Sequence, residues 1–153
     1  MTNQTIKHII KLFSLFATID RKQDQETIKF ILTKYLSYYI QNNYIQEFIS
    51  IYNFYIKQEL DNHASNRYKE ISIKSVKVLK LLDEINKELS YEGKVVLIIF
   101  LAKLLTVKEK VLRDEKDLLE TIALSLKIPE NELHDLLAFL IYGYKAVKNT
   151  ETL

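Results

Sequence analysis

The sequence predicts an all-α fold of about seven helices, arranged as two similar three-helix units that an amphipathic linker helix joins. Only two Gly and one Pro occur in 153 residues, whereas sheets and loop-rich folds need both at their turns. Apolar residues recur at helical spacing along most of the chain. The pattern also returns at an offset of 88 residues, which places Asn131 on Asn43. We therefore expect residues 1–153 to form a single duplicated domain.

The first unit is expected at about residues 5–58. Its first helix should cover about residues 5–19, and Asp24 is a plausible cap for the second helix. Asn43 follows a polar turn and is expected to cap the third. Each helix carries one apolar face, which fits a bundle that buries three such faces together.

The linker helix is expected at about residues 68–90, after a loop-like stretch at residues 61–66. Its predicted buried stripe consists of Ile71, Val78, Leu82, Ile85 and Leu89. The opposite, solvated side should carry Lys74, Lys77, Lys80 and Lys87. Glu84 and Glu88 interleave with these lysines, so we expect a solvated face and not a nucleic-acid site.

The second unit is expected at about residues 93–146. Ser90 should cap a helix over about residues 91–107, a second helix should cover about residues 114–126, and a third should begin near Pro129. Val95 to Ala102 is an uninterrupted apolar run, which predicts a helix buried on all sides. A membrane span needs about 20 apolar residues, so we expect a protein that is not embedded in a membrane.

Composition argues against several classes of function. Apolar residues make up 48% and charged residues 27%, which is typical of a soluble globular domain. A net charge of +2 lacks the basic excess of most nucleic-acid-binding domains. The absence of Cys excludes disulfides and thiolate chemistry, and it fits a cytoplasmic location. The amino terminus lacks the features of a secretory signal.

Catalytic motifs are also missing. The only glycines are Gly93 and Gly143, so no glycine-rich phosphate cradle is present. His8, His63 and His134 lack the spacing of a metal or catalytic site. A hydrolase with an unrecognised helical site would need convergent carboxylates, and no pair suggests itself. We expect a protein that is not an enzyme.

Two groups of residues are candidate sites. The acidic residues near two turns could supply oxygen ligands to a hard cation; they are Asp20, Asp24, Glu109, Asp114 and Glu115. The favoured alternative is that Asp24 and Asp114 cap helices and the others complement helix amino termini. The second group is Tyr44, Ile51 and Phe54, which fall outside the main apolar stripe of their helix. These three must pack under the linker helix or form an exposed partner surface.

The second unit resembles TerB-like domains of tellurite-resistance proteins. The resemblance rests on residues 101–107 (LAKLLTV), 108–115 (KEKVLRDE) and 126–133 (LKIPENEL), together with Leu118 and Leu119. It implies an all-helical, duplicated domain whose units each contain an Asp-Gly-x-Val turn and a Glu shortly after it. Val111 and Glu115 match that pattern.

The two turns also depart from the TerB-like pattern. Lys108-Glu109 and Asp20-Arg21 replace the Asp-Gly pairs, and Gln23 replaces the first valine. The resemblance implies divalent-metal binding at the acidic turns, although Lys108 places a positive charge there.

TerB-like modules also occur fused to ATP-binding-cassette proteins of Bacteroidetes. The resemblance therefore implies a bacterial interaction or regulatory module, with a protein partner or an attached ATPase domain, at the amino terminus of a larger ATP-binding-cassette protein. The alternative is a divalent-metal-responsive stress sensor.

Overall fold

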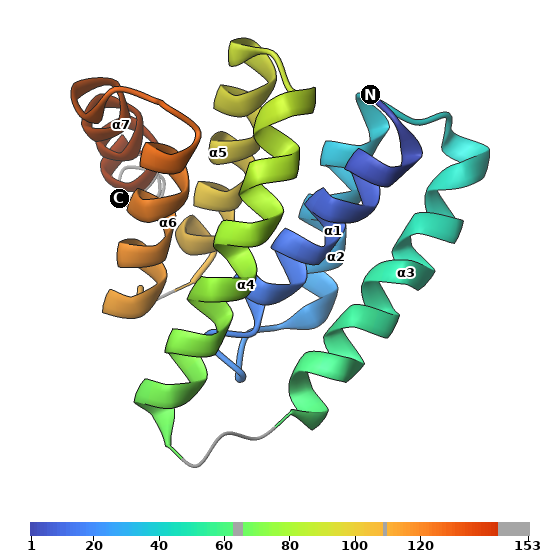
Figure 1. The fold of residues 1–153 in the computed structure, drawn as a ribbon, viewed down its shortest axis with the longest axis horizontal. Coiled ribbons are helices and arrows are strands. Elements are labelled where there is room, and N and C mark those ends of the chain that lie inside the picture. The colour runs from blue at the N-terminus through green and yellow to red at the C-terminus, as the bar shows by residue number, and fades with distance from the viewer. Residues whose placement is uncertain (63–65, 109, 144–153) are drawn as a thin grey trace, which may run out of the picture.

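The computed structural model describes residues 1–62, 66–108 and 110–143, and these residues contain seven α-helices and no strand (Figure 1). A π-helical turn, η1, extends the last helix. The elements are α1 (Asn3–Ala17), α2 (Gln25–Ser37), α3 (Asn42–Asp61), α4 (Arg67–Glu88), α5 (Tyr91–Thr106), α6 (Arg113–Ser125), α7 (Glu130–Leu137) and η1 (Ala138–Gly143). The predicted all-α class is confirmed.

The helix boundaries follow the offset seen in the sequence. The first residues of corresponding helices lie 88 positions apart; they are Asn3 and Tyr91, Gln25 and Arg113, and Asn42 and Glu130. This spacing of three successive helix starts is what a duplicated three-helix unit requires.

One core runs through the whole bundle. Helix α1 is its most buried element and packs against α3 and α4, while α4 also contacts α6. Helix α5 packs against α2, α6 and η1. Figure 1 shows α4 crossing in front of the bundle, with α3 at one edge and α7 at the other. The buried apolar side chains of all seven helices form a single cluster, so the two units do not have separate cores.

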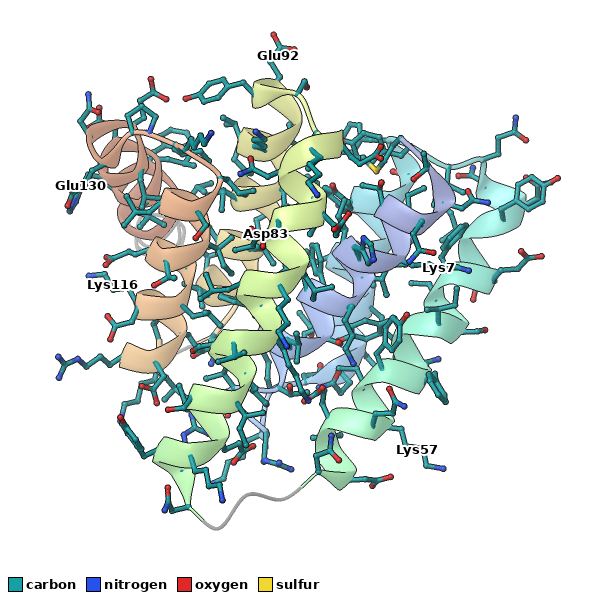
Figure 2. The ribbon with its side chains drawn as sticks, in the orientation of Figure 1. Lys7, Lys57, Asp83, Glu92, Lys116 and Glu130 are labelled. Atoms are coloured by element: carbon teal, nitrogen blue, oxygen red, sulfur yellow. The ribbon has the colours of Figure 1, made fainter. Side chains whose placement is uncertain are left out.

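Figure 2 labels several exposed charged side chains, whereas Glu59, Lys74 and Glu115 are buried; the exposed ones are Lys57, Asp83, Glu92, Lys116 and Glu130. Helix α5 is less completely buried than the sequence predicted. Leu97, Ile98 and Phe100 to Ala102 are buried, but Val95, Val96 and Ile99 are only partly buried.

Across the described ranges, no helix combines the length and the apolar character that crossing a bilayer would take.

Two of the predicted helix caps, Asp24 and Ser90, are present in the structure. The Asp24 carboxylate accepts a hydrogen bond from the backbone N–H of Glu26, and the Ser90 hydroxyl accepts one from that of Gly93. Two other predicted caps are wrong. Helix α3 begins at Asn42 with Gln41 as its N-cap, so Asn43 lies inside the helix. Asp114 lies in the first turn of α6, which Leu112 precedes as N-cap.

Lys74 is a further correction. It was predicted on the solvated side of the linker helix, yet it is only 3% exposed. Its ammonium donates hydrogen bonds of 2.8 Å to the backbone oxygen and to the hydroxyl of Thr18. The reason is geometric, since residue 74 lies three positions after Ile71 and four before Val78 and so shares their face. Lys80 and Lys87 are exposed as predicted.

Candidate functional site

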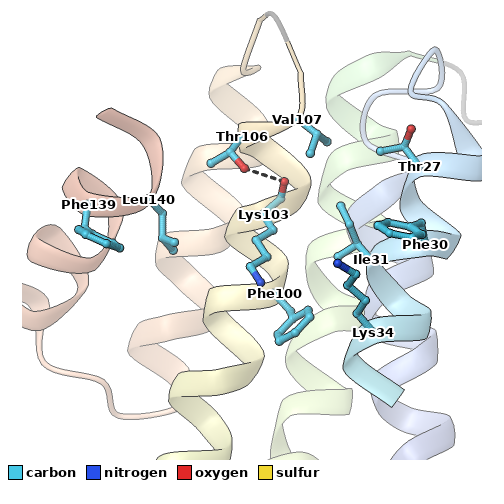
Figure 3. A pocket seen from close by; sticks show the side chains of 10 residues that line it. All are labelled: Thr27, Phe30, Ile31, Lys34, Phe100, Lys103, Thr106, Val107, Phe139 and Leu140. Atoms are coloured by element: carbon cyan, nitrogen blue, oxygen red, sulfur yellow. Dashed lines mark hydrogen bonds between the residues drawn. The ribbon is translucent and has the colours of Figure 1, made fainter. Parts of the chain in front are cut away.

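An apolar groove with a volume of about 700 Å³ lies between α2, α5 and η1 (Figure 3). We call it the α2–α5 groove. Its lining residues are Thr27, Phe30, Ile31, Lys34, Phe100, Lys103, Thr106, Val107, Phe139 and Leu140.

Two helices and one turn build this groove. The lining residues of α2 are three or four positions apart, so they form one stripe along that helix. They are Thr27, Phe30, Ile31 and Lys34. The lining residues of α5 and its C-cap span two turns, from Phe100 to Val107. Phe100 is buried on the floor, where its ring meets the rings of Tyr35 and Tyr38 edge-on at centroid distances of 5.4 and 6.0 Å. Turn η1 adds Phe139 and Leu140 at the opposite wall.

The walls of the groove expose large apolar side chains to water. Phe30 is 62% exposed and Phe139 is 76% exposed, and Val107 between them is also exposed. Isolated exposed apolar residues are common, but several around one hollow are typical of a contact surface. This arrangement is therefore suited to binding an apolar partner.

Two lysines add positive charge to the same groove. The Lys34 ammonium lies 4.7 Å from the ring centroid of Phe30, and the Lys103 ammonium lies 4.3 Å from that of Phe100. Figure 3 shows both side chains in the groove, on the neighbouring helices α2 and α5. Neither ammonium is within salt-bridge distance of a carboxylate of the described residues, and the lining residues include no Asp or Glu. The rings hold the two charges in place by cation–π attraction without neutralising them.

The sequence contained a signal for one wall of this groove. Phe30 lies outside the stripe of Ile28, Ile31 and Tyr35 that α2 buries. A large apolar residue off the buried stripe must be covered by another element or remain exposed. Phe139 could not be connected with Phe30 from the sequence, because only the packing of η1 on α5 brings the two walls together.

The predicted partner surface on α3 is exposed at two of its three residues. Tyr44 is 49% exposed and Phe54 is 59% exposed, whereas Ile51 is partly buried. Ile51 and Phe54 line a shallow hollow of about 360 Å³ together with Lys7, Ser50 and Tyr55, and Tyr44 lies outside it. Tyr44 and Phe54 therefore remain exposed and do not pack under α4, and their role as a partner surface stays a prediction.

The acidic turns meet around a lysine. The Lys108 ammonium lies 2.8 Å from a carboxylate oxygen of Asp20 and also forms a salt bridge with Glu115. Glu115 is fully buried and accepts a second hydrogen bond, of 3.0 Å, from the backbone N–H of Leu112. The hydrogen bond from Lys108 lowers the pKa of Asp20 below its usual value. A protein cation thus occupies the space between two of the predicted metal ligands.

The other predicted ligands lie apart from this pair. Asp24 caps α2, and the Asp114 carboxylate lies 3.6 Å from the Arg67 guanidinium. Glu109 lies outside the described residues. No group of three or more His, Asp or Glu side chains that could hold a metal ion occurs among residues 1–62, 66–108 and 110–143. Asp20 and Asp24 instead share a polar cleft of about 290 Å³ with Lys22 and Lys110, which adjoins the α2–α5 groove at Thr27 and Val107.

The chain matches no protein-family model, and searches of curated proteins and of solved structures found no match either.

Proposed function

We propose that this chain is a non-catalytic interaction module whose α2–α5 groove binds a segment of a partner protein. The exposed rings of Phe30 and Phe139 around one apolar hollow are the observation that carries the proposal. Water contact with these rings is unfavourable, and a partner that covers them recovers about 25 cal/mol for each Å² of apolar surface buried.

Two surfaces compete for this role, and the same experiment separates them. The full-length native gene product is immobilised and the proteins that it retains from its own cells are identified. The variant Phe30→Gln/Phe139→Gln removes apolar surface from the groove, and Tyr44→Gln/Phe54→Gln removes it from α3. All four side chains are exposed, so both variants should fold. We expect the groove variant alone to lose the retained partner. Loss with the α3 variant alone would move the binding site to α3.

The TerB-like motif extends the proposal to an identity for the whole gene product. We propose that the chain is the amino-terminal module of an ATP-binding-cassette protein, in which case the partner segment belongs to the same polypeptide or to its assembly. The motif at residues 101–115 is the support for this step. The coding sequence downstream of Leu153 tests it, because an ATP-binding-cassette segment there is expected and another kind of domain would contradict it.

The alternative of a divalent-metal-responsive sensor has weaker support. Lys108 lies between Asp20 and Glu115, and a metal would have to displace its ammonium. A ligand that prefers the folded state raises the melting temperature. We expect millimolar magnesium, calcium, manganese or zinc to leave that temperature unchanged, and a saturable rise with one of them would favour the sensor.

A further inference from the structure

We infer that the occupant of the α2–α5 groove is an amphipathic helix with acidic residues beside its apolar stripe. This inference rests on the proposed function and adds the chemistry of the partner. Three features of the groove carry it, namely its shape, the exposure of its walls and its charge.

The shape of the groove fits a helix. Its floor follows α5 from Phe100 to Val107, which at 1.5 Å per residue is a length of about 10 Å, or two helical turns. Helix α2 and turn η1 form the two sides of this floor. A helix laid between two helices inserts its side-chain ridge into the space between them. The occupant would therefore present apolar anchors at positions i, i+3 or i+4, and i+7.

The exposure of the walls favours a macromolecule over a small apolar ligand. Sites for small ligands enclose 70–90% of the ligand surface. In this groove Phe30 and Phe139 remain mostly exposed at the rim. A helix that rests on the floor also covers such rim residues, whereas a single acyl chain on the floor would leave them in water.

The charge of the groove selects acidic side chains. Lys34 projects from α2 and Lys103 from the floor on α5, and both approach rings but no carboxylate of the described chain. In the adjoining cleft, Asp20 pairs with Lys108 and Asp24 caps α2, so both carboxylates are already engaged. Glutamate or aspartate beside an apolar stripe would meet the ammonium groups of Lys34 and Lys103. A basic helix would place its charges against the same two lysines.

Designed peptides test this inference on the full chain. Three peptides of about 15 residues share one leucine stripe and carry Glu, Gln or Lys beside it, a length at which helices become stable enough to compare. Exposed ion pairs contribute about 0.2–1 kcal/mol each, so two pairs predict that the Glu peptide binds about 2- to 30-fold more tightly than the Gln peptide. The Lys peptide should bind most weakly. Added salt should reduce these differences.

Charge-reversal variants locate the effect. In Lys34→Glu/Lys103→Glu, the order of the three peptides should reverse. The matched control is Lys57→Glu/Lys116→Glu, which reverses two exposed lysines on α3 and α6, outside the groove, and should keep the original order. Far-UV circular dichroism of each variant verifies that the fold is intact.

The remaining outcomes separate the inference from the proposed function. The three peptides could bind equally well to the native chain and fail to bind Phe30→Gln/Phe139→Gln. That result would overturn the acidic preference and leave the proposed interaction module standing. Binding of dodecanoate but of no peptide would replace the helix with a lipid ligand. A dimer in light scattering that Phe30→Gln/Phe139→Gln dissociates would make a second copy the occupant. Both proposals would be overturned if no probe bound the native chain and Phe30→Gln/Phe139→Gln still retained the native partner.

Discussion

At the scale of single residues, Lys108 links the two equivalent turns of the duplicated pattern. It corresponds to Asp20 at the 88-residue offset, and in the folded chain these two equivalent residues form a salt bridge with each other. The same ammonium balances the fully buried carboxylate of Glu115. Removing one partner of a buried pair leaves an uncompensated charge, which is far more costly than losing a surface pair.

We predict that Lys108→Met lowers the free energy of unfolding by about 3 kcal/mol. Methionine keeps the length of the side chain but supplies no charge to Glu115. The exposed Lys22 of the neighbouring turn provides the control, and Lys22→Met should change stability by less than about 0.5 kcal/mol. Urea unfolding at pH 7 measures both. Restoration of stability in Lys108→Met/Glu115→Gln would support the explanation, and equal stabilities of the two single variants would contradict it.

Lys74 makes the stability depend on pH. Burial lowers its pKa to about 8, whereas a lysine in an unfolded chain has a pKa of about 10.4. Between these values the unfolded chain binds more protons, so the free energy of unfolding should rise with pH, by at most about 3 kcal/mol. Below pH 8 the lysine is charged in both states and this gain is absent.

The measurement is urea unfolding between about pH 7.5 and 9.5, for the native chain and for Lys74→Met. As pH rises, the unfolding free energy of the native chain should increase relative to that of Lys74→Met. The range stops before pH 10, because burial raises the pKa of Tyr35 and Tyr52 and their contribution has the opposite sign above that value. A difference that does not change with pH would show that the lysine is not titrating as expected.

At the scale of elements, periodicity predicted the helices well and their starts less well. Asp24 and Ser90 are recognisable caps because each is a short polar side chain just before an apolar stripe. The start of α6 has no such residue. There the side chain of Glu115 bonds back to the N–H of Leu112, so a residue inside the helix does the work of a cap. The sequence predicts Asp114 for that role, because its acidic side chain lies one position earlier.

The end of α6 was equally hidden in the sequence. Lys127 adopts a φ of 62°, which is the left-handed region that glycine usually occupies. The N–H groups of Lys127 and Ile128 donate to the carbonyls of Leu124 and Ala123, so the chain forms a Schellman motif. Nothing in the residue type of a lysine indicates this turn, because its stabilising bonds belong to the backbone.

Gly93 lies in the first turn of α5, and we predict that Gly93→Ala stabilises the protein by about 0.5–1 kcal/mol. A methyl group there would meet the Ser90 hydroxyl at 3.4 Å and a Leu89 methyl carbon at 3.5 Å, which are ordinary contacts. For a chain of this size the melting temperature should rise by about 1–4 °C. Ser90→Ala, which removes the cap of the same helix, should lower stability by about 1 kcal/mol. A lower melting temperature for Gly93→Ala would indicate strain at that contact.

At the scale of the whole molecule, the 88-residue offset predicted the order of the helices but not how the two units meet. The sequence assigned α4 the role of a linker with one solvated face. Instead, α4 packs against both α1 and α6 and buries Lys74 besides its apolar stripe. The α2–α5 groove was unpredictable for a related reason. Its walls come from residues more than a hundred positions apart, and no local pattern records that meeting.

The position of α4 leads to a prediction about cooperativity. Ile85 is fully buried in the shared core, and Ile85→Ala should remove about 2–5 kcal/mol of stability through lost contacts and a residual cavity. Because the core is continuous, this loss should appear in both units and not in one alone. The exposed Leu79 lies on the same helix, and Leu79→Ala should change stability by less than about 0.5 kcal/mol.

Native-state hydrogen exchange can measure the two units separately. Because α1 and α5 share one core, their slowest amides should exchange through global unfolding, and Ile85→Ala should reduce their free energies of opening by the same amount. Leu79→Ala should leave both unchanged. A reduction confined to α1 or to α5 would mean that the units unfold independently, and α4 would then be a tether between two domains. Equal reductions would make α4 a central element of one cooperative bundle, in which any partner bound to the α2–α5 groove stabilises both halves of the chain.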